Sequence, residues 1–346
     1  MNPLELAIRN SNPNQLRLLL ELGHDPNQKT GNENSLAGVA VQLNELRCLD
    51  YLIKAGANIN AKGIFKLSPL HQAVYYKNQQ AFDLLIKNNI DLNSRDYEAK
   101  TPLHIAIERQ NIESTISLIK NGADIHARDL GGKTPLFTAV MKNCVEATKI
   151  LINYGADVNA QDIHGQTPIF KAALLNYAEV FSLLILKGAS VEVKDKDNQT
   201  PLMMAALDGY TDLAKKLVDL GADVNALDRH GYSPLFYCAQ NFNFDFIALL
   251  LRNGSDMYAR GLGDKWIENI KFDMLYKGIC EKDSTLLTVI LKSGVNKNEV
   301  ERWSKILLEN AIKFFDRSVV NQLTSSGFNP KYLRTDQRKR LLRLIS

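Results

Sequence analysis

The chain has 346 residues, of which 45% are hydrophobic and 23% charged, a composition that excludes a disordered or collagen-like protein. No stretch of the sequence approaches the roughly 18 uninterrupted apolar residues that a membrane span needs. The four cysteines are too few for a disulfide framework at this length and favour a reducing compartment.

The formal net charge of +4 is concentrated at the carboxyl end. Residues 331–346 contain six bases and one acid, a local charge of +5, so the other 330 residues sum to −1. A nearly neutral body lacks the basic footprint of a dedicated nucleic-acid binder. The first residues show no charged-then-apolar leader. We therefore expect a monomeric cytoplasmic protein without a nucleic-acid partner and without a membrane span.

A regular period of about 33 residues runs along the chain, marked by a glycine before a short Asp- and Asn-rich segment. The markers are Gly23, Gly56, Gly122, Gly155, Gly188, Gly221 and Gly254, with Asn89 in the one remaining place. Gly294 follows after 40 residues and Gly327 after 33 more. Ten markers with one seven-residue insertion indicate a repeat architecture.

A second signal lies 21 residues before each marker and predicts a helix start. It reads Ser68-Pro69-Leu70-His71 and Thr101-Pro102-Leu103-His104 in two repeats, and similar segments begin at residues 134, 167, 200 and 233. Ser or Thr caps a helix N-terminus, and Pro suits the first helical position, where no backbone donor is needed. The later Gly or Asn suits the left-handed residue that ends a second helix. Each repeat is therefore predicted to contain two helices.

Five residues after each cap position the side chain is small, as close stacking of helices requires. The series is Ala7, Ala40, Ala73, Ala106, Ala139, Ala172, Ala205, Cys238, Gly278 and Ala311. Two residues after each cap the series is Leu, Ile or Ala without exception. The register continues beyond the insertion, so a separate C-terminal domain is not expected.

A 33-residue unit with T-P-L-H and G-A-D-x-N motifs resembles the ankyrin repeat over about residues 2–333. The resemblance implies an all-α solenoid of about ten helix-turn-helix repeats with hairpin loops. We expect repeats 1–8 over residues 1–261, a long inserted loop over 262–272, degenerate repeats 9 and 10 over 273–333, and a basic amphipathic capping helix over 334–346. Degenerate end repeats are typical, because they face water on one side.

No residues point to catalysis, a cofactor or a metal, so we expect a non-enzymatic protein. Gly131-Gly132-Lys133-Thr134 imitates the end of a phosphate-binding loop, but Ala127 stands where that loop needs its first Gly. His71 and His104 lie one repeat apart, and stacked helices are roughly 8–10 Å apart, too far for shared coordination. The resemblance implies that these histidines are structural hydrogen-bonders.

The positions that the repeat leaves free are the expected partner-binding residues, since ankyrin partners usually bind the concave face of hairpin tips and first helices. They are Tyr75, Tyr76, Tyr97, Arg109, Met141, Leu174, Leu175, Leu207, Tyr232 and Trp266. If the stack is regular, the large apolar members form a stripe typical of an interaction site. The alternative is that some, Leu174 especially, pack against the neighbouring hairpin.

Three further features each have more than one interpretation. A row at the hairpins (Lys29, Lys62, Arg95, Arg128, Gln161, Lys194, Leu227, Arg260) either meets an acidic partner or is an ordinary feature of the repeat. Trp266 in the inserted loop either contacts a partner or folds back over the change of register. The basic C-terminal helix is a solvated cap, meets an acidic membrane surface or an acidic partner, or acts as a targeting signal.

The sequence therefore predicts a protein–protein interaction module. The resemblance and the 31 asparagines lead us to a sharper hypothesis, an effector that an intracellular bacterium delivers to the host cytosol. The resemblance also implies that asparagines of this motif can be hydroxylated by a host asparaginyl hydroxylase, and Asn159 and Asn225 are the candidates here. The alternative function is an adaptor whose segment 262–346 is a separate effector or ligase-recruiting, F-box-like element.

Overall fold

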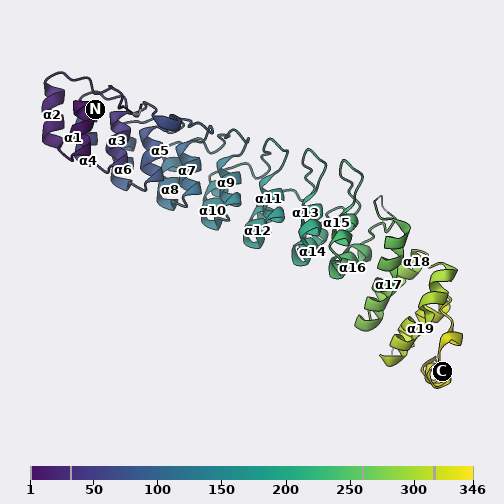
Figure 1. The fold of residues 1–346 in the computed structure, drawn as a ribbon. Coiled ribbons are helices and arrows are strands. Elements are labelled where there is room, and N and C mark those ends of the chain that lie inside the picture. Colours follow the sequence, from purple (N-terminus) through teal and green to yellow (C-terminus); the bar gives the residue numbers. More distant parts are fainter. Residues whose placement is uncertain (1, 32, 259–260, 315–316, 346) are drawn as a thin grey trace. The chain divides into compact units, whose positions relative to one another are not determined.

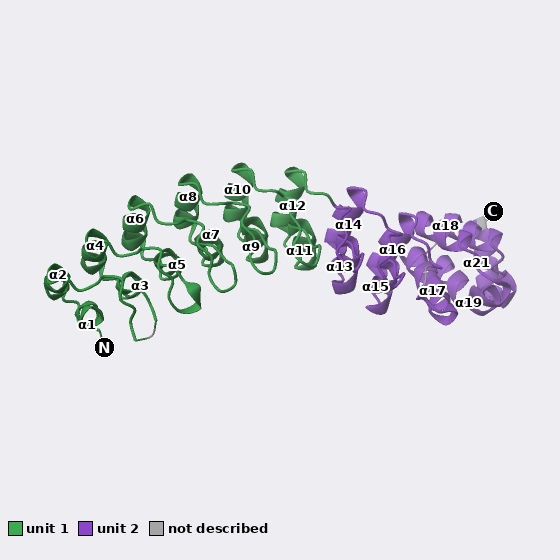
Figure 2. Ribbon diagram, turned by 90° about the horizontal axis from the view of Figure 1, so that it is seen from above, with its two compact units in different colours: residues 1–190 green, residues 191–346 purple. Residues whose placement is uncertain are grey.

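The computed structural model describes residues 2–31, 33–258, 261–314 and 317–345. The chain divides into two compact units, residues 1–190 and 191–346 (Figure 2). Apart from one isolated bridge between Lys29 and Ser35, the described residues contain no β-pairing, so the predicted all-α class is confirmed. None of their helices combines the length and the apolar character that crossing a membrane requires.

Six helix pairs build the first unit, and a hairpin-like loop follows each pair (Figure 1). Figure 2 shows the first helices of the pairs in one row and the second helices in a parallel row. The elements are α1 (Pro3–Arg9), α2 (Pro13–Glu21), α3 (Leu36–Gln42), α4 (Leu46–Lys54), the 3₁₀-turn η1 (Ile64–Lys66), α5 (Pro69–Tyr75), α6 (Gln79–Lys87), α7 (Pro102–Glu108), α8 (Ile112–Lys120), α9 (Pro135–Met141), α10 (Val145–Asn153), α11 (Pro168–Leu174) and α12 (Ala178–Leu186).

The predicted caps start the first helices of eight repeats. The N-cap residues are Asn2, Ser35, Ser68, Thr101, Thr134, Thr167, Thr200 and Ser233. In α9, for example, the Thr134 hydroxyl accepts a hydrogen bond from the Phe137 amide at 3.3 Å. Each cap satisfies one of the backbone donors that a helix start leaves without an intrahelical partner.

The second helices end in the predicted left-handed residue, with Asn89 replacing glycine in one repeat. Asn89 has φ +56°, and its amide donates to the Ile86 carbonyl at 3.1 Å. The equivalent Gly56 has φ +81° and donates to the Ile53 carbonyl at 3.0 Å. Asn tolerates this conformation better than other residues with a side chain, so the helix end is the same in both repeats.

The small residues that follow each cap by five positions lie in the interior of the helix stack. The ten members of this series, from Ala7 to Ala311, are all buried. Large side chains, including Phe82, Phe137 and Phe170, are also fully buried. Enlarging one of the small residues forces backbone or rotamer shifts, because the interior is close-packed.

The second unit begins with two regular helix pairs and ends in longer helices (Figure 1). Its elements are α13 (Pro201–Asp208), α14 (Thr211–Asp219), α15 (Pro234–Gln240), α16 (Phe244–Arg252), α17 (Asp264–Glu281), α18 (Ser284–Lys292), α19 (Lys297–Lys313), α20 (Arg317–Ser325), the 3₁₀-turn η2 (Pro330–Tyr332) and α21 (Thr335–Ile345).

The prediction of an inserted loop over residues 262–272 is wrong from Asp264 onward, because this segment is the first part of the 18-residue helix α17. Ile267, Ile270, Met274 and Leu275 are buried on one face, at the spacing of an amphipathic helix. The insertion therefore lengthens a helix instead of a loop.

Helix α19 also begins before residue 306, the cap position expected five residues before Ala311. Its N-cap is Asn296, whose side chain accepts from the Glu299 amide at 2.9 Å, while Glu299 accepts from the Asn296 amide at 2.6 Å. Only residues 293–296 separate α18 from α19, so no hairpin fits there. The capping box favours a helix start at this position instead of at residue 306, because it satisfies two backbone donors reciprocally.

A buried ion pair joins the two long helices. Lys271 of α17 lies 3.6 Å from Glu299 of α19, and the two side chains are only 6% and 5% exposed. The Lys271 ammonium also donates to the Gly294 carbonyl at 2.6 Å. Both charges are thus paired and hydrogen-bonded, as burial of charge requires.

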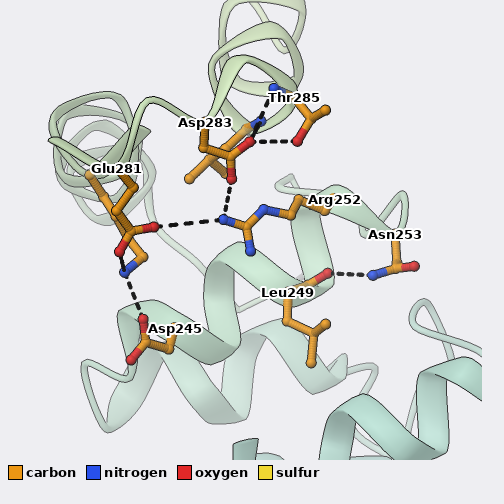
Figure 3. A network of polar contacts seen from close by, with 9 residues as sticks. Asp245, Leu249, Arg252, Asn253, Glu281, Asp283 and Thr285 are labelled. Atoms are coloured by element: carbon orange, nitrogen blue, oxygen red, sulfur yellow. Dashed lines mark hydrogen bonds and ion pairs between the residues drawn. The ribbon is translucent and has the colours of Figure 1, made fainter. Parts of the chain in front are cut away.

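A more exposed network joins α16, α17 and α18 (Figure 3). Arg252 of α16 contacts Asp283 and lies 3.9 Å from Glu281. Lys277 bridges Glu281 and Asp245, each at 2.6 Å. Asp283 also caps α18, because it accepts from the Leu286 amide at 3.0 Å. The network fixes the turn between α17 and α18 against the preceding pair.

The helix predicted at the carboxyl end is present as α21 and packs against α19 and α20. Leu341 is buried, whereas Leu342 is exposed. The Arg338 guanidinium donates to the carbonyls of Leu333, at 3.0 Å, and Pro330, at 3.1 Å. One of the bases therefore has a structural role in the preceding turn, and one of the apolar residues does not serve the core.

Candidate functional site

The hairpin loops are built by aspartates in a fixed place of the repeat. The Asp96 carboxylate accepts hydrogen bonds from the amides of Glu98 and Lys100, both at 2.8 Å. Asp162 does the same with His164 at 2.8 Å and Gln166 at 3.0 Å. These Asx-type turns hold each loop in one conformation. The residue after the aspartate is thereby presented at the tip.

Neighbouring tips are joined by backbone hydrogen bonds. Within the first unit the amides of Tyr97, Leu130 and Ile163 donate to Phe65, Glu98 and Gly131 at 2.8, 2.9 and 3.0 Å. The side chains of Ile64, Tyr97, Leu130 and Ile163 occupy one register position, and all four are exposed. We call these four residues the tip column. They present a row of large apolar groups to solvent.

The tip column contains three residues that the sequence analysis missed, Ile64, Leu130 and Ile163. Tyr97 was predicted as a single position, although its register partners are visible in the sequence at the same place of the neighbouring repeats. In the second unit the same register holds Lys196 and Arg229. The next residue at this spacing, Leu262, is half-buried, so the row of large exposed apolar side chains belongs to the first unit.

The first helices supply the opposite wall of two pockets. One, of about 370 Å³, is lined by Asn34, Gln42, Ile64, Phe65, Leu67, Gln72, Tyr75 and Tyr76. The other, of about 550 Å³, is lined by residues that include Tyr97, Glu98, Lys100, Glu108, Leu130 and Met141. Each pocket combines members of the tip column with predicted residues. We call this surface of the first unit, pockets included, the hairpin–helix face.

Arg109 and Tyr75 hold each other on this face. The Arg109 guanidinium carbon lies 3.6 Å from the centre of the Tyr75 ring, within cation–π distance. The Tyr75 and Tyr76 rings meet edge to face at 5.2 Å. Both tyrosines are about half exposed, 47% and 48%. The two rings are thus oriented by neighbours while keeping area free for contact.

Charged side chains line the second pocket. The Lys100 ammonium contacts Glu98 at 2.5 Å and Glu108 at 2.8 Å. Although burial acts to lower the pKa of Lys100, the hydrogen bonds and charges of these two carboxylates together outweigh it and raise that pKa. Lys100 is therefore charged throughout the physiological range, and the pocket offers both signs of charge to a ligand.

The other predicted residues do not all join this face. Leu175 is exposed and Leu174 half-buried at the end of α11, and neither lines the two pockets. Leu207 and Tyr232 belong to the second unit. The ring of half-buried Tyr232 stacks on Phe236 with 4.0 Å between centroids. Trp266, also half-buried, stacks on Phe242 at 5.5 Å and lies in α17, not in a loop.

The basic row at the hairpins is partly used by the fold. Lys62 donates to the Arg95 carbonyl at 2.9 Å, and Arg95 donates to the Arg128 carbonyl at 2.7 Å. Arg128 continues the series to the Gln161 carbonyl. Arg260 lies outside the described residues. Side chains that tie one repeat to the next explain the periodicity without an acidic partner.

The histidines are structural, as the resemblance implied. His71 Nδ1 accepts from the Ser68 amide at 3.3 Å, so Nε2 carries the proton and donates to the Lys100 carbonyl at 3.0 Å. His104 repeats the arrangement with Thr101 and with the Lys133 carbonyl, at 3.2 and 3.1 Å. Each ring ties a helix start to the next repeat. Burial lowers the pKa of both imidazoles.

Two of the four cysteines, Cys48 and Cys238, lack the environment of a nucleophile. Burial, with a smaller contribution from Glu45, raises the pKa of Cys48 to about 11, and burial also raises the pKa of Cys238. A reactive thiol needs a lowered pKa. Within the described part of the chain, no group of three or more His, Cys, Asp and Glu side chains is placed to hold a metal ion.

The two candidate hydroxylation sites lie at the bases of hairpins. The Asn159 side chain accepts from the Ser190 amide at 3.1 Å. The Asn225 side chain accepts from the Asp256 amide at 2.8 Å and donates to the Gly254 carbonyl at 3.0 Å. Both residues are exposed, and each links its repeat to the next.

Comparison with known proteins identifies the repeat. The profile of the family "Ankyrin repeats (3 copies)" matches residues 36–129, 117–195 and 169–260. The crystal structure of the ankyrin repeat domain of Bcl-3, a member of the IkappaB protein family, is similar with a TM-score of 0.56 and 27% identity. That match covers 59% of this chain and 93% of the Bcl-3 domain. No curated protein sequence matches significantly.

Proposed function

Because the chain belongs to the ankyrin-repeat family, whose repeats are a general protein–protein interaction module, we propose that its hairpin–helix face binds a partner protein. In this proposal the protein is a non-enzymatic module. The repeats are its scaffold, and the side chains at the positions that the repeat leaves free contact the partner. The tip column is the observation that carries the proposal. Four large apolar side chains in one exposed row have no role in the core of their own repeats.

The chemistry of the face supports a protein ligand. Tyr75, Tyr76 and Tyr97 present amphipathic rings, the side-chain type that most often anchors protein interfaces. Lys100 with its two glutamates adds polar groups that fix the orientation of a ligand. An apolar centre with a polar rim is the ordinary anatomy of an interface.

The test is capture of partners from eukaryotic cell lysate with the intact protein and two variants. The double variant Tyr75→Ala/Tyr97→Ala removes one anchor from each pocket, whereas Tyr154→Ala removes a similarly exposed tyrosine at the end of α10. Circular dichroism verifies that both variants are folded. We expect a partner that is lost with the double variant and retained with Tyr154→Ala. Retention with both variants would contradict the proposal.

We propose in addition that the partner is a host protein and that the chain acts in the host cytosol as an effector of an intracellular bacterium. The 31 asparagines, which are typical of AT-rich genomes, support this proposal. A fusion to a reporter enzyme that is active only in eukaryotic cytosol tests delivery during infection. Asn159 and Asn225 are proposed hydroxylation sites there, and mass spectrometry would detect one added oxygen atom on either peptide. A reporter that stays silent would argue against the effector role.

The adaptor alternative gains no support from the end of the chain. A separate element over 262–346 should leave the repeat stack, but α18 packs against α16 and α20 packs against α18. The second helices of the two regular pairs, α14 and α16, pack against each other in the same way. We therefore propose that α17, α18, α19 and α20 belong to the repeat array.

A further inference from the structure

The second and third repeats depart from the pattern at three positions that lie close together. Gly38 stands where the following repeats have His71, His104, Phe137 and Phe170. Gly63 stands where they have the hairpin aspartate. Phe65 adopts a left-handed conformation, with φ +56°, and its side chain is 71% exposed. A bulky residue in this conformation is strained, and such strain is concentrated at functional sites.

The first departure leaves space in the core. In the next repeat His71 reaches the Lys100 carbonyl, and the equivalent carbonyl for residue 38 is that of Leu67. Gly38 has no side chain to reach it. The carboxamide of Gln72 lies in this space, because a Cβ atom on Gly38 would be 3.0 Å from Gln72 Oε1 and 3.1 Å from Nε2. Both Leu67 and Gln72 line the smaller pocket of the hairpin–helix face.

Gln72 is the unusual group in this pocket. The residue is 7% exposed, and its Oε1 atom has no hydrogen-bond partner among the described residues. A buried polar atom without a partner costs free energy, so its retention calls for an explanation. The equivalent position in the next repeat is Ile105, which shows that the fold does not need an amide there.

We propose that this pocket receives an aromatic side chain of the partner that carries one hydrogen-bond donor, a tryptophan or tyrosine, and that the donor pairs with Gln72 Oε1. The inference rests on the proposed function and names the group that the hairpin–helix face recognises. Ile64, Phe65, Leu67, Tyr75 and Tyr76 supply apolar and aromatic walls. The planar Tyr75 and Tyr76 rings, held edge to face, suit an inserted ring.

The lining also determines the charge of the occupant. None of the residues that line this pocket is charged, in contrast to the neighbouring pocket around Lys100. An ionised group would therefore lose its hydration without gaining a counter-charge. A neutral aromatic ring with one N–H or O–H group supplies the donor that Gln72 Oε1 lacks among the described residues and brings no charge into the pocket.

The test uses the intact protein and small probes. N-acetyl-tryptophanamide, its indole-N-methyl derivative and N-acetyl-tyrosinamide are titrated into ¹⁵N-labelled protein, and amide shifts are followed by NMR. We expect the tryptophan or the tyrosine probe to shift the signals of Gln72, Tyr75 and Tyr76, and the N-methyl derivative to bind roughly tenfold more weakly than the tryptophan probe. Absence of shifts for both donor probes, or equal binding of the N-methyl derivative, would overturn the proposal.

A variant designed on the next repeat provides the control. Gln72→Ile copies Ile105 and removes the unpaired amide, so we expect a melting temperature equal to or above that of the native protein and loss of the difference between the two tryptophan probes. Gln80→Ile, on the neighbouring helix α6, is the matched substitution away from this pocket and should leave probe binding unchanged. A Gln72→Ile variant that still distinguishes the probes would contradict the role of the amide.

The partner captured above separates this inference from the proposed function. If Gln72→Ile binds that partner as tightly as the native protein while Tyr75→Ala/Tyr97→Ala does not, the pocket assignment fails and the hairpin–helix face stands. If the double variant also binds normally, the proposed function itself fails.

Discussion

Single side chains connect successive repeats in this protein, and the two histidines show how sensitive such links are to pH. His71 and His104 each accept from a backbone amide and donate to a carbonyl of the next repeat, which only the neutral imidazole can do. Burial holds the pKa of both rings below the ordinary value of 6.5. As pH falls through 6.5 the unfolded chain therefore takes up protons before the folded chain does.

We predict that the free energy of unfolding is constant with respect to these histidines above pH 6.5 and decreases below it, by up to about 1.4 kcal/mol per pH unit for each ring. The variant His104→Phe, which copies Phe137 of the next repeat, should have a smaller slope. Urea unfolding at about pH 7.5 and at about pH 5.5, on either side of the ordinary histidine pKa, provides the comparison. Equal slopes in the variant and the native protein would exclude this role.

Burial separates leucines of the same repeat array into two energetic classes. Leu136 of α9 is fully buried, whereas Leu186 of α12 is 80% exposed. We predict that Leu136→Ala destabilises the first unit by about 2–5 kcal/mol, since it leaves a cavity, and that Leu186→Ala changes stability by less than about 0.5 kcal/mol. Denaturant unfolding measures both. Similar losses in the two variants would mean that the packing register is misassigned.

Helices α17 and α19 differ from the other elements in being long and in sharing a buried ion pair. We predict that Lys271→Met destabilises the second unit by about 3–5 kcal/mol, because Glu299 is left buried without its counter-charge. Adding Glu299→Gln should restore part of the loss, since the amide still accepts the capping bond but carries no charge. The measurement is chemical denaturation of the single and double variants. A double variant less stable than the single one would contradict this explanation.

Regular elements could be predicted from the sequence, and the long ones could not. The caps from Asn2 to Ser233 follow from local chemistry that recurs once in every repeat, so α1–α16 have their predicted place and order. In α17 the repeat register was followed and a second pattern was overlooked, the amphipathic helical spacing of Ile267, Ile270 and Met274. The ion pair between Lys271 and Glu299 joins α17 to α19, and such a contact between distant parts of the chain cannot be predicted from a local pattern.

Across the whole molecule, the free positions of the repeats divide the chain into regions of different chemistry. The tip register is apolar in the first unit, at Ile64, Tyr97, Leu130 and Ile163, and charged at Lys196 and Arg229 in the second. The sequence identified exposed tyrosines on this surface. It could not identify the pocket at Gln72, because that pocket depends on a missing side chain at Gly38 and on the backbone conformation of Phe65.

The most direct test of the account is the dissociation constant of the isolated partner for a set of tip variants. We predict that Tyr97→Ala and Leu130→Lys weaken binding by more than about tenfold, because each removes a large apolar contact from the hairpin–helix face. Lys196→Ala and Tyr154→Ala should stay within about twofold of the native value, since neither residue belongs to that face. Equal dissociation constants for all four variants would contradict the account.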